Sequence, residues 1–145
     1  MLTDTKNKPS LLLVEDSEDD AYFFERTFQK SGLACALHRA NNGAEAMDYL
    51  QNASIKDSED FPQLMFLDLK MPIVNGFEVL DWLRHQPFAN QIRVVVLSGS
   101  DHQHDKVRAA ELGATDYLVK PVRTGDLDRF LKDVCTGESR KGANR

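Results

Sequence analysis

The sequence contains few cysteines, no long apolar run and no excess of positive charge. Cys35 and Cys135 are its only two cysteines, too few for a disulfide framework, so a reducing cytoplasm is the expected location. No apolar run approaches the ~20 residues that a membrane-spanning helix needs, and residues 1–10 lack the apolar stretch of a signal peptide. The net charge of −5 argues against a surface that binds nucleic acid. We therefore expect no membrane and no nucleic-acid partner.

What is present indicates one globular domain. The 145 residues are 41% hydrophobic and 28% charged, which excludes a collagen-like, low-complexity or mainly disordered chain. A chain of this length forms one domain with a substantial core and is too short for two comfortable ones. We expect the domain at residues 10–135, between flexible tails at 1–9 and 136–145.

Short apolar runs alternate with amphipathic segments along the chain. The runs are typical of strands and lie at 11–14, 35–39, 64–67, 92–97 and 117–119. Residues that cap helices begin the segments between and after them: Ser17 with Asp20, Asn42 with Glu45, Asn75 with Glu78, Ser100 with Gln103, and Thr124. The acidic segment 53–61 is predicted to be a long surface loop. Five strands that are each followed by a helix predict an α/β fold, a doubly wound five-stranded parallel sheet.

The residues that follow these strands carry the chemistry. Glu15 and Asp16 follow the first strand, Asp68 the third, Ser98 the fourth and Lys120 the fifth. Because the carboxyl ends of parallel strands share one edge of a sheet, we expect these side chains to converge. Clustered carboxylates stay ionised only beside compensating cations. Lys120 supplies one positive charge, and all-oxygen ligation favours Mg²⁺ or Mn²⁺ over zinc for the rest.

These residues and spacings resemble the receiver domain of two-component response regulators, over about residues 10–135. The resemblance rests on the acidic pair Glu15-Asp16, the D-L-K-M-P run at 68–72 with Gly76, and Ser98, Tyr117 and Lys120-Pro121. It implies the flavodoxin-like (βα)5 receiver fold with strand order 2-1-3-4-5. It also implies a signalling phosphoacceptor rather than an enzyme, although such a protein assists its own phosphorylation and dephosphorylation.

The resemblance implies a role for each site residue. Asp68 would accept a phosphoryl group from the phosphohistidine of a histidine kinase. Asp16 and Asp68 would ligate Mg²⁺ (or Mn²⁺) together with the backbone carbonyl of Lys70, and Glu15 would act mainly through a metal-bound water. Lys120 would pair with Asp68 and then with a phosphoryl oxygen.

Ser98 and Tyr117 would form the switch that reports phosphorylation. The Ser98 hydroxyl would move toward the phosphoryl oxygens, and Tyr117 would rotate into the space vacated beside the fifth strand. This movement would remodel the face made by the fourth helix, the fifth strand and the fifth helix, which is the expected output surface. The family pattern also implies a cis peptide bond between Lys120 and Pro121.

A finer resemblance is to single-domain regulators that serve bacterial phytochrome histidine kinases. It rests on L-L-V-E-D-S-E-D-D, the acidic insertion at 53–61, L-D-L-K-M-P, G-F-E-V-L and V-V-L-S-G-S. It implies a light-sensing kinase or a phosphotransfer protein as donor, a downstream protein target and, in some members, a homodimer. About ten residues follow the fifth predicted helix, too few for an output domain, so we expect a stand-alone receiver that acts by protein contact.

Several alternatives stay open at this stage. The chain could be a chemotaxis-like receiver or a phosphorelay shuttle for a different kinase, or an adaptor that is never phosphorylated. It could also be a phosphohydrolase with an aspartyl-phosphate intermediate, but that class normally needs a second acid where this chain has Lys70. Lys70 lies near the path of a hydrolytic water, so we expect it to influence the lifetime of the aspartyl phosphate.

Three other side chains suggest function less strongly. His102 and His104 look like a metal pair, but their spacing places them on different faces of a helix, so we interpret both as solvated. Tyr22 falls off the inward stripe of the first helix. It is a candidate kinase contact, and a merely exposed tyrosine is the simpler interpretation.

Overall fold

The structure is a computed structural model that describes residues 8–55 and 60–136, without the side chains of residues 135 and 136. The tails expected at 1–9 and 136–145 therefore lie almost entirely outside the described residues. Within the described ranges, no helix combines the length and the apolar character that crossing a bilayer requires.

A five-stranded parallel sheet forms the middle layer of the molecule. The strands are β1 (Ser10–Val14), β2 (Ala36–Ala40), β3 (Leu64–Asp68), β4 (Arg93–Ser98) and β5 (Asp116–Val119). They lie in the order β2-β1-β3-β4-β5, and every neighbouring pair is parallel. This confirms the predicted fold class and strand order. The order reverses between β1 and β3, the position at which sheets of this kind bind ligands.

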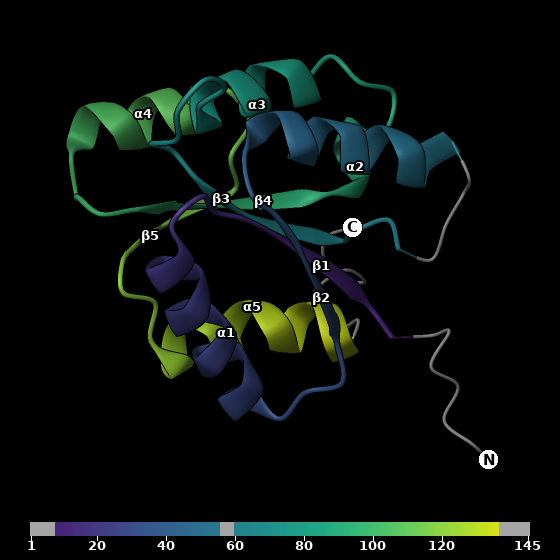
Figure 1. Ribbon diagram of the computed structural model, residues 1–145, viewed down its shortest axis with the longest axis vertical. Coiled ribbons are helices and arrows are strands. Elements are labelled where there is room, and N and C mark those ends of the chain that lie inside the picture. Colours follow the sequence, from purple (N-terminus) through teal and green to yellow (C-terminus); the bar gives the residue numbers. More distant parts are fainter. Residues whose placement is uncertain (1–7, 56–59, 137–145) are drawn as a thin grey trace.

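Helices cover both faces of the sheet (Figure 1). Helices α1 (Glu18–Ser31) and α5 (Thr124–Thr136) lie on one face, and α2 (Gly43–Ile55), α3 (Gly76–Leu83) and α4 (Gln103–Glu111) lie on the other. A short 3₁₀ turn, η2 (Ala89–Gln91), precedes β4. Consecutive parallel strands need such crossovers, which are right-handed in nearly all proteins.

The central strands are apolar on both faces because helices cover both. In β1, Leu12 and Val14 belong to the core cluster under α2, α3 and α4, whereas Leu11 and Leu13 belong to the cluster under α1 and α5. Phe66 of β3 is fully buried in the second cluster. Packing on both faces therefore fixes where each central strand lies. It also fixes the positions of the polar residues that follow the strand.

The predicted strands are correct to within one residue at each end, and most predicted caps are present. The Ser17 side chain accepts a hydrogen bond from the Asp20 backbone N–H, and Gly32 ends α1 in the left-handed conformation at φ 70°. Asn75 and Glu78 form a reciprocal capping box at the start of α3. These local contacts explain why the helices begin where the sequence pattern indicates.

The cap predicted at Ser100 is wrong. Helix α4 begins at Gln103, and His102 occupies the cap position without a side-chain cap hydrogen bond. The hydroxyl of Ser100 is buried and has no hydrogen-bond partner among the described residues. The reason is that the Ser100 backbone is held instead in the loop after β4, where its N–H donates to Ser98 Oγ at 3.2 Å.

The loop predicted at 53–61 is partly helical. Helix α2 continues to Ile55 because Ala53 extends its buried stripe of Ala46 and Leu50 by one more turn. Residues 56–59 lie outside the described residues.

One finding at Cys35 was not predicted from the sequence. This residue is disulfide-bonded in the structure and is 8% exposed in the core cluster under α1 and α5. A count of cysteines limits the number of possible bonds, but it does not show which sulfur atoms the fold brings together.

Gly76 packs closely against the backbone of Asp68 and Leu69, and this contact supports a first prediction. A Cβ at Gly76 lies 2.5 Å from the Asp68 carbonyl oxygen and 2.8 Å from the Leu69 Cα, so Gly76→Ala forces the backbone to shift. We expect it to lower the free energy of unfolding by about 1–3 kcal/mol. Gly125→Ala is the matched control: it also lies in the first turn of a helix, with nothing within 4 Å. It should change stability by less than about 1 kcal/mol or increase it. Urea unfolding measures both, and equal effects contradict the close approach.

Candidate functional site

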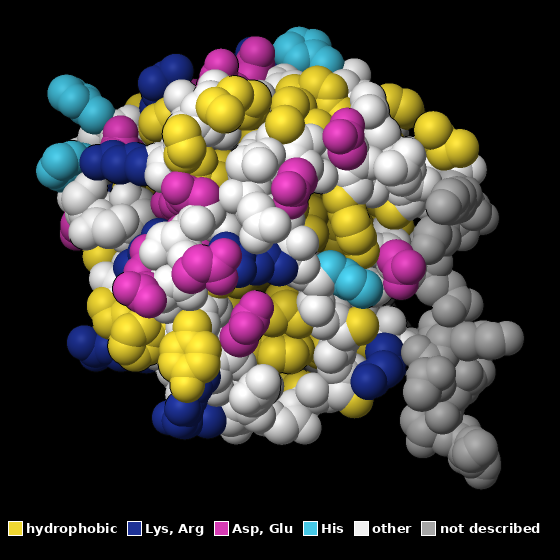
Figure 2. Space-filling model, viewed as in Figure 1, with side chains coloured by type: hydrophobic (Ala, Val, Ile, Leu, Met, Phe, Trp, Pro, Cys, Tyr) yellow, Lys and Arg dark blue, Asp and Glu magenta, His cyan; other side chains and the backbone are white. Residues whose placement is uncertain are grey.

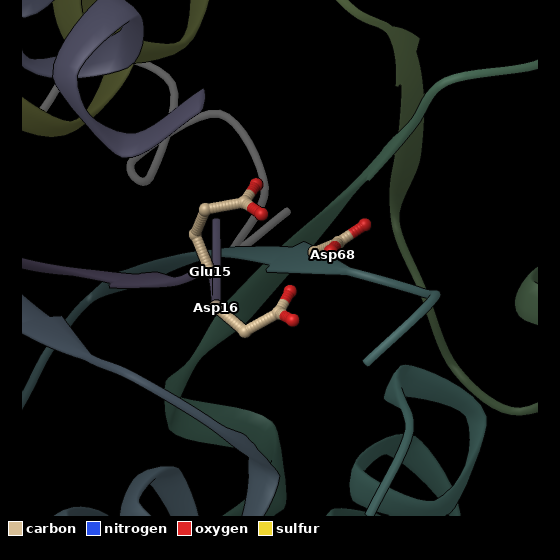
Figure 3. Close-up of side chains that lie close together, drawn as sticks. All are labelled: Glu15, Asp16 and Asp68. Atoms are coloured by element: carbon tan, nitrogen blue, oxygen red, sulfur yellow. The ribbon is translucent and has the colours of Figure 1, made fainter. Parts of the chain in front are cut away.

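Three carboxylates meet where β1 and β3 end (Figure 3). Glu15 and Asp16 directly follow β1, and Asp68 is the last residue of β3. One oxygen from each lies within 4.8 Å of the others. Glu15 and Asp68 are buried, with exposed fractions of 1% and 4%, and Asp16 is exposed. The predicted convergence of these three residues is therefore present.

The predicted lysine reaches the same cluster from β5. The Lys120 Nζ lies 2.8 Å from Glu15 Oε1, 2.9 Å from Asp20 Oδ2 and 3.4 Å from Asp68 Oδ1. Its backbone N–H donates to the Ser98 carbonyl oxygen at 2.7 Å, and the Lys120–Pro121 peptide bond is cis, as the resemblance to receiver domains implied. The end of β5 is thus fixed against the end of β4, with the ammonium directed at the acids.

Burial and mutual charge set the protonation of the cluster. Burial raises the pKa of Asp68 to about 7, the charge of Glu15 adds to the rise, and the Lys120 ammonium opposes it. For Lys120, burial acts to lower the pKa, but hydrogen bonds to Glu15 and Asp20 and the charges of Asp68 and Glu15 outweigh burial and raise it. Lys120 therefore stays charged, while Asp68 needs further positive charge to ionise fully below neutral pH.

The donor set of the cluster fits a hard divalent cation. Glu15, Asp16 and Asp68 offer only carboxylate oxygens, which Mg²⁺ and Mn²⁺ prefer. The Lys120 ammonium contacts three carboxylates, Glu15, Asp20 and Asp68, and Asp16 lies beside two of them, so the local charge in this part of the described structure is negative. Acidic side chains also gather above the start of α1 on the face that Figure 2 shows. A divalent cation would relieve both the raised pKa and the local excess of negative charge.

Backbone contacts hold the two acidic segments in place. The Ser17 N–H donates to Glu15 Oε2 at 3.2 Å, and the Lys70 N–H donates to Asp68 Oδ1 at 3.4 Å. The second contact brings the backbone of Lys70 beside the cluster while its side chain remains exposed.

The two predicted switch residues, Ser98 and Tyr117, both contact Ser100 in the loop after β4. Ser98, the last residue of β4, is 1% exposed, and its Oγ accepts a hydrogen bond from the Ser100 N–H at 3.2 Å. The hydroxyl of Tyr117 donates to the Ser100 carbonyl oxygen at 3.1 Å. The Lys106 Nζ lies 5.7 Å from the centre of the Tyr117 ring. A change at Ser98 therefore has a short covalent and hydrogen-bonded route to Tyr117.

Comparison with known proteins assigns the chain to one family. The family described as "Response regulator receiver domain" matches residues 11–132. The chain belongs to this family. That assignment confirms the resemblance inferred from the strand-end residues, and it covers nearly all of the part of the chain that the structure describes.

This receiver is similar to single-domain regulators over most of its length. It is 31% identical over 134 residues to "Response regulator Rcp1" from Synechocystis, covering 92% of this chain and 91% of Rcp1. The solved structure of the bacteriophytochrome response regulator AtBRR is 34% identical, with a TM-score of 0.75, covering 88% of this chain and 93% of that one. The Mn²⁺-bound form of Rcp1 is 30% identical, with a TM-score of 0.68, covering 87% of this chain and 91% of that one.

Two residues near the cluster were not predicted from the sequence. Asp20 was interpreted only as the partner of the Ser17 cap, yet its side chain contacts Lys120. The Arg39 Nε and Nη2 donate to the Glu15 carbonyl oxygen at 3.2 and 2.9 Å. Both have a signal in the sequence: Asp20 lies in the first turn of the helix that follows the acidic pair, and Arg39 lies near the end of a strand that shares the same edge of the sheet.

The residues interpreted as solvated are exposed. His102 and His104 both lie on the surface of the segment that begins α4, as expected. Tyr22 is 57% exposed, and its hydroxyl accepts a hydrogen bond from Arg26 at 3.0 Å.

Proposed function

We propose that this receiver accepts a phosphoryl group on Asp68 from a histidine kinase and signals through the surface formed by α4, β5 and α5. One observation carries the proposal: a buried carboxylate at a strand end lies beside an ammonium and two further acids. In the transfer, an Asp68 oxygen forms a bond to phosphorus while the bond from phosphorus to the histidine nitrogen breaks. Such transfers depend mainly on positioning and on stabilising charge at the phosphoryl oxygens.

Mg²⁺ or Mn²⁺ is the proposed cofactor. Asp16, Asp68 and the backbone carbonyl of Lys70 would hold it directly, and Glu15 mainly through a water. When bound, the metal supplies positive charge that keeps Asp68 ionised and stabilises the phosphoryl oxygens. The mutual approach of the three carboxylates and the position of the Lys70 backbone support this ligand set.

Lys120 and Ser98 are the proposed phosphoryl-binding residues. The Lys120 ammonium already lies 3.4 Å from Asp68 Oδ1, so it can donate to a phosphoryl oxygen after a small movement. Ser98 ends the neighbouring strand, and its hydroxyl is free to donate because it accepts the Ser100 N–H in this structure.

The output switch is proposed to run from Ser98 through Ser100 to Tyr117. When the Ser98 hydroxyl turns toward the phosphoryl group, the Ser100 N–H loses its acceptor, and the loop that holds the Tyr117 hydroxyl rearranges. Tyr117 then rotates toward the space vacated beside β5. This changes the α4–β5–α5 surface, to which Tyr117 and Lys106 both contribute.

Substitutions at Tyr117 test the switch. Beryllofluoride with Mg²⁺ mimics a phosphoryl group on a carboxylate, and the backbone amide NMR signals of α4 and α5 report the response. Tyr117→Phe should keep most of the wild-type shifts because it loses only the hydroxyl, whereas Tyr117→Ala should reduce them at least severalfold. Equal shifts in the wild type and Tyr117→Ala rule out the switch.

A phytochrome-type light-sensing kinase is the proposed phosphoryl donor, and the cytoplasm is the proposed location. The similarity to AtBRR, whose title names it a bacteriophytochrome response regulator, supports the first proposal. A homodimer and an unnamed protein target are the further partners that this class suggests. The domain is proposed to span residues 10–135.

Acetyl phosphate and Mg²⁺ test the central reaction without a kinase. Intact-mass measurement should show one phosphoryl adduct, and EDTA should abolish it. Catalytic turnover of phosphate esters instead favours the phosphohydrolase, for which the exposed Lys70 stands where an acid is needed. Absence of any adduct with Mg²⁺ present favours an adaptor that is not phosphorylated.

A further inference from the structure

Three acidic side chains surround the Lys120 ammonium in this structure. Its Nζ lies 2.8 Å from Glu15, 2.9 Å from Asp20 and 3.4 Å from Asp68. An ammonium group has three N–H donors and no more. When Asp68 is phosphorylated, its negative charge passes to the phosphoryl oxygens. The Lys120 ammonium must then turn from Asp68 toward those oxygens, and this movement weakens its contact with Glu15 or with Asp20.

The exposure of Glu15 and Asp20 decides which of these two contacts is released. The side chain of Glu15 is 2% exposed, whereas that of Asp20 is 43% exposed. A buried carboxylate that loses its cation is left unpaired in a low dielectric, which is strongly unfavourable. Water can replace the ammonium at Asp20, so releasing Asp20 costs least.

We propose that Asp20 is a positioning residue: it holds Lys120 in the unphosphorylated state and releases it when Asp68 is phosphorylated. This inference rests on the proposed function of Asp68. Asp20 competes with the phosphoryl group in two ways, because it occupies a Lys120 donor and because its own negative charge repels the phosphoryl oxygens. The carboxylate at position 20 therefore weakens phosphoryl binding.

The surroundings of Asp20 allow its side chain to move without disturbing the fold. A cavity of about 350 Å³ opens beside the Asp20–Lys120 pair, and Phe23 and Val122 contribute to its wall. The backbone N–H of Asp20 is bonded separately to the Ser17 cap, so the first turn of α1 stays in place when the side chain leaves Lys120. Only the carboxylate needs to turn toward solvent.

Beryllofluoride binding in the presence of Mg²⁺ tests the proposal. Asp20→Asn should bind beryllofluoride about threefold to tenfold more tightly than the wild type, as expected for losing one half-exposed ionic competitor. Asp19→Asn is the matched control, since Asp19 is an exposed acid in the same helical turn and makes the same change of charge. It should leave the affinity within about twofold of the wild type, and Asp20→Glu should restore most of the wild-type value.

A second measurement follows the carboxylate directly. The side-chain ¹³C signal of Asp20 should shift when beryllofluoride binds to the wild type, whereas that of Asp19 should not. Equal affinities of Asp20→Asn and Asp19→Asn, weaker binding by Asp20→Asn, or an unmoved Asp20 signal each overturn the proposal. If the wild type binds no beryllofluoride and forms no phosphoryl adduct, the proposed function of Asp68 fails, and the inference about Asp20 fails with it. A failure at Asp20 alone leaves the function of Asp68 intact.

Discussion

Asp68→Asn should form no phosphoryl adduct with acetyl phosphate and Mg²⁺, while the wild type forms one. The substitution preserves the shape of the side chain and replaces the attacking oxygen by an amide, which is a very poor nucleophile toward phosphorus. Intact-mass measurement checks the result. Asp48→Asn is the matched control, because Asp48 is exposed on α2. This substitution removes the same charge outside the acidic cluster. An adduct of wild-type yield on Asp68→Asn contradicts the assignment of the phosphoacceptor.

The same variant should be more stable than the wild type in EDTA, by about 1–4 kcal/mol above pH 7. The pKa of Asp68 is raised from 3.8 to about 7 in the folded protein, so the folded state binds a proton more tightly than the unfolded chain does. Wild-type stability therefore falls as the pH rises from about 4 to 7, and the variant avoids that loss. Lys120 keeps Glu15 and Asp20 as partners in the variant.

Urea unfolding across this pH range measures the difference. The advantage of Asp68→Asn should be small near pH 4, grow toward pH 7 and then level off. Mg²⁺ should reduce it by stabilising the wild type more than the variant. A variant that is less stable than the wild type at pH 8 in EDTA contradicts the burial of an unfavourable charge at Asp68.

Lys120→Met should have the second large effect. It should lower the stability of the protein, whereas Asp68→Asn should raise it. Removing the ammonium leaves Glu15 and Asp68 buried without a cation, which typically costs about 3–5 kcal/mol of stability. The rate of adduct formation should also fall by about 10²- to 10³-fold, because one charged donor to the phosphoryl oxygens is lost. Urea unfolding in EDTA and the time course of intact mass measure the two effects.

Lys106→Met is the control for this substitution. Lys106 pairs with Asp101 at the surface, so the same chemical change should cost less than about 1 kcal/mol and leave the adduct rate nearly unchanged. If Lys120→Met is no less stable than Lys106→Met in EDTA, the ammonium does not balance the acidic cluster.

The main architecture and most of the site could be predicted because both follow from strand ends. Runs such as 11–14 and 64–67 are apolar at every position, which indicates strands covered on both faces, and parallel strands bring their carboxyl ends to one edge. The polar residues directly after those runs, such as Asp68 and Lys120, could then be placed together without knowledge of any side-chain conformation.

Contacts that depend on side-chain direction were not predictable in the same way. Asp20 has a backbone role as the Ser17 cap partner, and its side chain is separately directed at Lys120, so one role concealed the other. Serine is a residue type that often caps helices, but the Ser100 backbone makes hydrogen bonds to the side chains of Ser98 and Tyr117 instead. Local propensity favoured a cap there, and contacts between distant segments determined the outcome.

Locating the phosphoryl group within the chain tests the central claim most directly. The protein is treated with acetyl phosphate and Mg²⁺, reduced with borohydride, which converts an aspartyl phosphate to homoserine, and digested for peptide mass spectrometry. We predict homoserine at position 68 and no such conversion at Asp16 or Asp20. Conversion at another acid, or none at Asp68 in a sample whose intact mass shows the adduct, contradicts the account.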